Sequence, residues 1–144
     1  MRFQRLEALI GADQIEKLHS KTVMICGIGG VGSYAAEALA RSAIGHLILV
    51  DSDKVDITNI NRQIIALDST LNRPKVNVMS DRIKDINPDA IVTPLNVYID
   101  DSSISMLLDF YPDYVIDAID SIASKCLLIS SCIQKNILFW EGIY

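Results

Sequence analysis

The stretch Gly27-Ile28-Gly29-Gly30-Val31-Gly32-Ser33 decides the fold of this chain. It follows an apolar run, Thr22 to Cys26, and precedes a helical pattern, so it predicts a strand, a glycine turn and the start of a helix. Gly27, Gly29 and Gly32 fit the spacing G-x-G-x-x-G, which allows a tight turn, an approach of backbone to phosphate and close packing of helix on strand. Exposed N–H groups and the positive end of the helix dipole favour a phosphate at such a turn. The turn therefore predicts a nucleotide site and leaves the nucleotide and its chemistry open.

Apolar runs and helical spacings alternate along the rest of the chain. Strands are expected over 22–26, 47–50, 90–95, 114–116 and 137–140. Helices are expected as short amphipathic segments within 2–20, near 61–67, and over 31–42, 74–86, 102–110 and 121–135. Continuous apolar strands are typical of parallel sheets that are covered on both faces. The alternation predicts one α/β domain over residues 1–144, with a Rossmann-like, open, mostly parallel sheet and helices on both faces.

Helical spacing also predicts the buried side of each helix. After the glycine turn, the expected inward side chains are Val31, Tyr34, Ala35, Ala38 and Leu39. In the last helix they are Ile122, Cys126, Ile129 and Ile133. The three cysteines, Cys26, Cys126 and Cys132, lack C-x-x-C spacing. We therefore expect reduced thiols packed in the core, and neither a zinc site nor a disulfide.

Composition narrows the class of protein. The chain is 50% hydrophobic and 22% charged, which is typical of globular proteins. No apolar run approaches the roughly 20 residues that span a bilayer, and the N-terminus lacks the apolar core of a signal peptide. We expect a cytoplasmic protein without membrane association. The net charge of -5 gives no overall electrostatic footprint for nucleic acid. The last residues, 141–144, resemble a turn that continues, so we expect an N-terminal fragment of a longer chain.

The glycine turn alone is compatible with a dinucleotide. Asp51 lies nineteen residues after Gly32, at the end of an apolar strand, and would hydrogen-bond a ribose hydroxyl in an NAD-binding protein. On this evidence the chain could be an NAD-binding oxidoreductase, or a nucleotide-binding module without catalytic activity.

Four further features favour a different reaction: the segment 59–63 (Asn-Ile-Asn-Arg-Gln), Lys75, the pair Asp117 and Asp120, and the N-terminal arginines. Attack of a carboxylate on an α-phosphate builds negative charge and expels pyrophosphate, so it needs cationic donors and a metal ion held by carboxylate. Hydride transfer has little use for these groups. Each acid also has a structural alternative, because Asp117 or Asp120 could cap the following helix. Arg62 could be a solvated surface cation.

These motifs resemble the superfamily of ubiquitin-activating enzymes and of the molybdopterin- and thiamine-biosynthesis adenylyltransferases (ThiF/MoeB/HesA), over essentially the whole chain. The resemblance implies an ATP-binding adenylation domain that uses ATP and Mg²⁺. The implied nucleotide-binding residues are Gly27, Gly29, Gly30, Gly32, Asp51, Asn59, Arg62, Gln63 and Lys75. It also implies that Arg62 and Lys75 act in catalysis and that Asp120 binds the metal. Arg5, in preference to Arg2, would reach the ATP of a partner subunit in a homodimer.

Within the superfamily, the glycine stretch, residues 55–64, Ala66-Leu67 and residues 115–121 most resemble the tRNA threonylcarbamoyladenosine dehydratase branch. That branch implies ATP-dependent dehydration and cyclisation of threonylcarbamoyladenosine, with tRNA as the partner. The cyclising attack is intramolecular, so it needs no cysteine nucleophile. The alternative is adenylation of the C-terminus of a ubiquitin-like sulfur-carrier protein by an enzyme of the ubiquitin-like modifier activating type.

Overall fold

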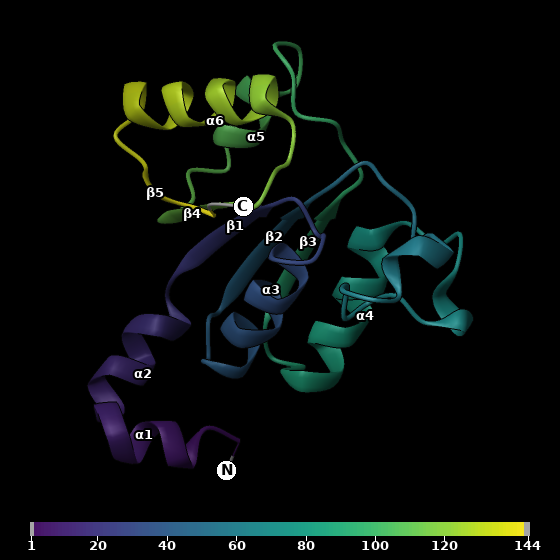
Figure 1. Cartoon of the computed structure of the whole chain (residues 1–144). Helices are drawn as coiled ribbons and strands as arrows, with labels where there is room; N and C mark the ends of the chain where they lie inside the picture. The colour runs from purple at the N-terminus through teal and green to yellow at the C-terminus, as the bar shows by residue number, and fades with distance from the viewer. Residues whose placement is uncertain (1, 143–144) are drawn as a thin grey trace.

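Five parallel strands form one sheet at the centre of the structure, a computed structural model that describes residues 2–142 (Figure 1). The strands are β1 (Thr22–Cys26), β2 (His46–Val50), β3 (Ile91–Leu95), β4 (Tyr114–Asp117) and β5 (Leu138–Glu141). Their spatial order is β3-β2-β1-β4-β5, and each pairing in the described part of the chain is parallel. The predicted open α/β sheet is confirmed. Of the turn expected over 141–144, Ile143 and Tyr144 lie outside the described residues.

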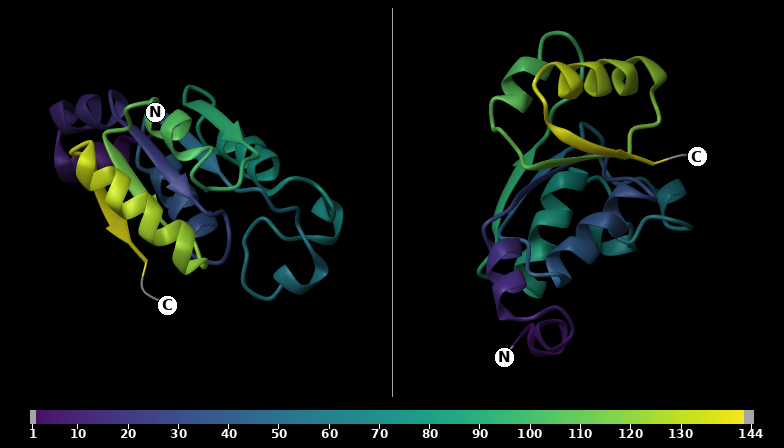
Figure 2. Two further views of the ribbon diagram at one scale, coloured as in Figure 1. Left: turned by 90° about the horizontal axis from the view of Figure 1, so that it is seen from above. Right: turned by 90° about the vertical axis from the view of Figure 1, so that its left-hand side faces the viewer.

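Helices cover both faces of the sheet, which gives three layers (Figures 1 and 2). One face carries α3 (Gly32–Arg41) and α4 (Lys75–Ile86), and the other carries α5 (Ile104–Leu108) and α6 (Ile122–Gln134). Ahead of β1, α1 (Gln4–Ile10) and α2 (Ala12–His19) extend away from the layers and bury none of their residues. Among the helices of residues 2–142, none has the length and apolar character needed to cross a membrane.

The central strand divides the core in two. Val23 and Ile25 face the cluster under α3 and α4, whereas Met24 and Cys26 face the cluster under α5 and α6. Successive side chains of a strand point to opposite faces, so a strand covered on both sides must be apolar at every position. This explains the continuous apolar run before the glycine turn.

The helix expected near 61–67 is wrong. The chain forms two single-turn 3-10 helices instead, η1 (Ile57–Asn59) and η2 (Asp68–Thr70). Asp56 and Asn59 cap each other in η1, because the Asp56 side chain accepts from Thr58 N–H and the Asn59 side chain accepts from Asp56 N–H. Such local side-chain bonds compete with a continuing helix.

The predicted inward face of α3 is partly wrong: Leu39 packs against the core as predicted, whereas Tyr34 and Ala38 are exposed. The buried residues are Gly32, Ser33, Ala36 and Ala40, and Tyr34 is 53% exposed. The cause is the close approach of the helix to the glycine turn: a Cβ on Gly32 would lie 1.7 Å from the carbonyl oxygen of Gly27. Small side chains therefore face the sheet, although the larger neighbours are more hydrophobic.

The predicted inward face of α6 is the outer one. Ile122 and Ile133 are 78% and 62% exposed, Cys126 is exposed, and the row that faces the sheet is Ser124, Leu128 and Cys132. Two polar contacts turn the helix this way: Ser124 Oγ donates to the carbonyl oxygen of Ile99 at 2.7 Å, and Lys125 Nζ to Asp117 Oδ2 at 2.8 Å. The core placement predicted for the thiols therefore holds for Cys26 and Cys132 and is wrong for Cys126. Burial raises the pKa of Cys132 to about 11.

Candidate nucleotide-binding site

A cavity of about 300 Å³ opens at the carboxyl ends of the parallel strands. Ligands of open α/β sheets bind in this position, where the strand order reverses. The structure brings most of the predicted site residues together in the lining: Gly27, Gly29, Gly30, Asp51, Asn59, Arg62, Gln63, Lys75 and Asp120. Gly32 lies behind the turn, and Arg5 lies elsewhere in the chain.

The four glycines divide into two structural classes. Gly27 has φ 91, and a Cβ there would lie 2.5 Å from the carbonyl oxygen of Ala118. The backbone thus requires Gly27, and Gly32 for the reason given above. At Gly29 and Gly30 the nearest atoms to an added Cβ are side-chain atoms of Gln63 and Arg62, at 3.7 and 3.5 Å. These two glycines have space, so their missing side chains leave the cavity wall open to a ligand.

Asp51 joins the end of β2 to the glycine turn. Its Oδ2 accepts from Ile28 N–H at 2.7 Å, and its Oδ1 accepts from Asp53 N–H at 2.7 Å. Burial raises the pKa of Asp51 above its usual value, and the two backbone N–H groups act in the opposite direction. The carboxylate is therefore fixed beside the turn, where it can accept a hydrogen bond from a ligand hydroxyl.

The segment after η1 provides polar groups on one wall of the cavity. Asn59 accepts the N–H of Gln63 at its carbonyl oxygen, which turns the chain so that both residues line the cavity. Gln63 is 6% exposed, and its Oε1 has no hydrogen-bond partner among the described residues. A buried acceptor without a donor is costly, so this oxygen suits a hydroxyl or a metal-bound water of a ligand. Arg62 is exposed at the rim, where its guanidinium donates to the Thr58 carbonyl at 3.0 Å.

Lys75, the first residue of α4, places a buried ammonium group in the cavity. It is 5% exposed, and its Nζ lies 3.0 Å from Asp53 Oδ2. The Asp53 side chain is 67% exposed, so water hydrates most of the carboxylate that pairs with this lysine. Sequence reasoning did not place Asp53 in the site. The sequence feature that could have indicated Asp53 is its position as the second acid after the apolar strand 47–50.

Of the two acids at and after the end of β4, one lines the cavity. Asp120 lines the cavity, and the N-cap of α6 is Ser121, so the capping alternative for Asp120 is wrong. Asp117 is fully buried below the lining, where its Oδ1 accepts from Ile119 N–H at 3.1 Å. Within residues 2–142, no group of three or more His, Cys, Asp and Glu side chains is arranged to hold a metal ion. A single carboxylate fits Mg²⁺, which takes its other ligands from water and substrate phosphates.

The apolar part of the cavity lining was missed from the sequence. It consists of side chains from the loops after β3 and β4, namely Val97, Tyr98, Ile99 and Ile119. These apolar and aromatic groups suit a nucleobase, which buries a flat ring. Ile119 lies within the motif 115–121 but was not assigned to the site, and no local motif marks the other three, because the four residues meet only when the parallel strands align.

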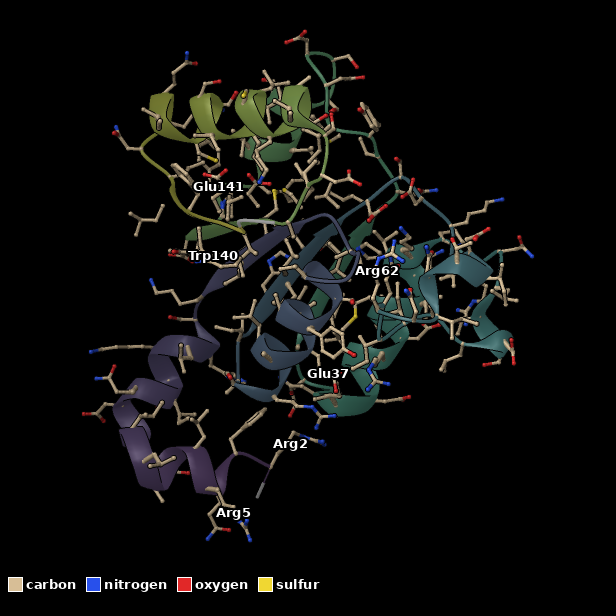
Figure 3. All side chains as sticks on the ribbon, in the orientation of Figure 1. Arg2, Arg5, Glu37, Arg62, Trp140 and Glu141 are labelled. Atoms are coloured by element: carbon tan, nitrogen blue, oxygen red, sulfur yellow. The ribbon has the colours of Figure 1, made fainter. Side chains whose placement is uncertain are left out.

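The two N-terminal arginines lie far from the cavity. Arg5 is on α1 at the lower end of the molecule, well separated from Arg62 (Figure 3). Arg2 donates to the carbonyl oxygen of Ile86 at the end of α4, at 2.7 Å. Within the described residues Arg5 makes no ion pair. A single chain therefore does not bring Arg5 to the cavity.

Comparison with known proteins agrees with this architecture. The ThiF family matches residues 3–143. The tRNA threonylcarbamoyladenosine dehydratase of Bacillus subtilis is 48% identical over 136 residues, which cover 94% of this chain and 54% of that protein. The molybdopterin-synthase adenylyltransferase of Escherichia coli is 34% identical over 144 residues, covering 99% and 57% of the two chains.

Solved structures agree as well. The crystal structure of E. coli tRNA N6-threonylcarbamoyladenosine dehydratase, TcdA, in complex with ATP superposes with a TM-score of 0.95 at 39% identity, covering 97% of this chain and 58% of that one. This chain spans about half the length of the curated relatives it matches. The predicted superfamily is confirmed: the chain belongs to the ThiF family.

Proposed function

We propose that this chain is the ATP-binding adenylation domain of an enzyme that dehydrates threonylcarbamoyladenosine in tRNA. The observation that carries the proposal is one cavity that unites an open glycine cradle, a fixed carboxylate and a buried lysine. The identity of 48% to the B. subtilis tRNA threonylcarbamoyladenosine dehydratase supports the choice of reaction.

Each wall of the cavity suits one part of ATP. Asp51 accepts from the ribose hydroxyls, and the apolar wall around Tyr98 covers the base. The open backbone at Gly29 and Gly30 approaches the phosphates, and Lys75 with Arg62 supplies positive charge to them. Asn59 and Gln63 complete the polar wall. This arrangement favours ATP over NAD, because hydride transfer does not require the positive charges of Lys75 and Arg62.

The chemistry follows from charge placement. A threonyl carboxylate attacks the α-phosphorus, the bond to the β-phosphate oxygen breaks, and pyrophosphate leaves. The carbamoyl oxygen then attacks the activated acyl carbon, a proton leaves the carbamoyl nitrogen, and AMP departs as the ring closes. Lys75 and Arg62 stabilise the negative charge that builds on the phosphates. Asp120 would hold Mg²⁺, which neutralises further phosphate charge when it is bound.

A second copy of the chain completes this proposed site. Arg5 is remote from the cavity of its own chain, and α1 leaves Leu9 82% exposed. In a homodimer the projecting N-terminal helices supply Arg5 to the neighbouring ATP. We place this enzyme in the cytoplasm, where tRNA is available.

The test is a reaction with the full-length protein that contains this chain. It is incubated with ATP, Mg²⁺ and tRNA that carries threonylcarbamoyladenosine, and the nucleosides are then analysed by mass spectrometry. The proposal predicts loss of one water from threonylcarbamoyladenosine. A carrier-protein adenylate in a parallel reaction, with unchanged tRNA, would redirect the assignment to a sulfur-carrier activator, which the 34% identity to the molybdopterin-synthase adenylyltransferase keeps as the second candidate.

A further inference from the structure

The loop between β4 and α6, residues 118–121, forms part of the wall of the cavity, and all four of its residues line it. Two hydrogen bonds donated by backbone N–H groups hold its first half. Ala118 N–H donates to the carbonyl oxygen of Cys26 at 2.8 Å, and Ile119 N–H donates to Asp117 Oδ1 at 3.1 Å. The shape of this wall therefore depends on the position of the Asp117 carboxylate.

Asp117 is fully buried and does not line the cavity. Its Oδ2 accepts from Lys125 Nζ at 2.8 Å. Its other titratable neighbours are the buried thiols of Cys26 and Cys132, whose pKa values are raised first by burial and then by this carboxylate. A carboxylate in such surroundings needs a cation beside it to offset the cost of its burial.

Lys125 is the cation that meets this requirement. Its side chain is 15% exposed, and the ammonium group also lies 3.5 Å from the carbonyl oxygen of Gly142 and 3.7 Å from Glu141 Oε1. The neighbouring Ser124 donates to the carbonyl oxygen of Ile99, on the apolar wall. One turn of α6 thus contacts both Asp117, below the loop 118–121, and Ile99 on the apolar part of the lining.

We infer that Lys125 is a positioning residue for nucleotide binding, which acts through Asp117 to fix the loop 118–121. Lys125 does not touch the nucleotide. Its ammonium group holds the Asp117 carboxylate in place, so that Oδ1 is available to Ile119 N–H and Asp120 faces the phosphates. The nucleotide part of this inference rests on the proposed function, and the loop part does not.

A second lysine, at the C-terminal end of α6, provides a matched control. Lys135, at the C-cap of α6, pairs with Asp109 at 2.9 Å, and both side chains are partly exposed. Lys135 does not line the cavity. Lys125→Met and Lys135→Met therefore each remove an ammonium group paired with an aspartate, Lys125 within α6 and Lys135 at its C-cap, and the carboxylate that loses its partner is buried in the first case and exposed in the second.

The first measurement needs no ligand. Amide hydrogen exchange of the full protein is followed in the peptide that contains residues 117–121. Lys125→Met should accelerate exchange in this peptide, and Lys135→Met should leave it unchanged. Unchanged exchange in folded Lys125→Met would overturn the inference whatever the protein binds.

The second measurement is ATP affinity in the presence of Mg²⁺, under conditions in which circular dichroism shows each variant to be folded. Lys125→Met should weaken ATP binding by roughly tenfold, the size typical of lost outer-shell support. The double variant Asp117→Asn/Lys125→Met removes both charges and keeps an oxygen for Ile119 N–H, so it should recover most of the affinity. It also serves if Lys125→Met does not fold.

The outcomes separate the two claims. Failure of the double variant to recover affinity, or an equal loss in Lys135→Met, would overturn the positioning role while the proposed function stands. Absence of ATP binding in the unmodified protein would overturn the proposed function and the nucleotide part of the inference together.

Discussion

Two lysine–aspartate pairs lie at the cavity; both lysines are largely buried, and the pairs differ in the exposure of the carboxylate. In the pair Lys75–Asp53 the lysine side chain is 7% exposed and the carboxylate 67%. In the pair Lys125–Asp117 the values are 15% and 0%. The two distances, 3.0 and 2.8 Å, are nearly the same. Geometry alone would therefore treat the pairs as equivalent.

The difference in burial assigns different tasks to them. A buried carboxylate cannot be left without its cation, so Lys125 is committed to Asp117. A hydrated carboxylate loses little when its partner turns away, so Lys75 can exchange Asp53 for a phosphate. One pair thus maintains the wall of the site, and the other holds a cation ready for the ligand.

The largest expected effect is on stability. Lys125→Met should lower the free energy of unfolding by about 3–5 kcal/mol, because it leaves a buried carboxylate unpaired. Urea denaturation measures this loss. The neutral double variant Asp117→Asn/Lys125→Met should recover most of it, and a Lys125→Met variant as stable as the unmodified protein would remove the distinction between the two pairs.

Lys75→Met should show the reverse pattern. Asp53 stays hydrated, so the free energy of unfolding should change by less than about 1 kcal/mol. ATP affinity should fall at least about tenfold, since a hydrogen bond to a charged group contributes roughly 1.5–3 kcal/mol. Calorimetry with ATP and Mg²⁺ gives the affinity. Loss of stability without loss of affinity would contradict the exchange of partners.

Asp53→Asn tests the same pair through the partner of Lys75. The substitution removes a carboxylate that competes with phosphate for Lys75, so ATP should bind about two- to fivefold more tightly. The same calorimetric titration measures it, with Asp109→Asn as a control for loss of a surface aspartate beside a lysine. Weaker binding in Asp53→Asn would mean that the ligand itself needs this carboxylate.

The smallest expected effect is a pH dependence of the free energy of unfolding that arises from His46, and neither lysine–aspartate pair should alter it. Burial lowers the pKa of His46, so the unfolded state takes up this proton at higher pH than the folded state. The corresponding stability is present above about pH 6.5 and is lost as pH falls below that value. The raised pKa of Asp51 acts in the opposite direction. Urea denaturation at several pH values should therefore show a weaker loss towards acid pH in His46→Gln, and the same difference in a Lys75→Met background. An unchanged profile in His46→Gln would contradict this.

The sequence predicted the sheet well because each strand is a short apolar run with a polar end. All five strands lie within two residues of their expected bounds. It also predicted the cavity lining on the glycine side, since those residues belong to contiguous motifs. What failed were the helix expected near 61–67, part of the inward face of α3 and the inward face of α6. Periodicity ranks side chains by hydrophobicity, whereas close packing at Gly32 and the polar contacts of Lys125 set the actual rotation of these helices.

The same reason explains why Asp53 and Lys125 were missed. Each acts through a partner 22 or 8 residues away in sequence, across two elements, and no local pattern marks that partner. Asp120, in contrast, was identified from the local sequence, but its role was ambiguous. A local capping rule made it ambiguous, and the structure assigns the cap to Ser121.

The most direct test of the central claim is a calorimetric titration of the protein with ATP and Mg²⁺ beside an identical titration with NAD. The account predicts saturable binding of ATP, weakened at least about tenfold in Lys75→Met, and far weaker binding of NAD. Binding of NAD without binding of ATP would contradict it.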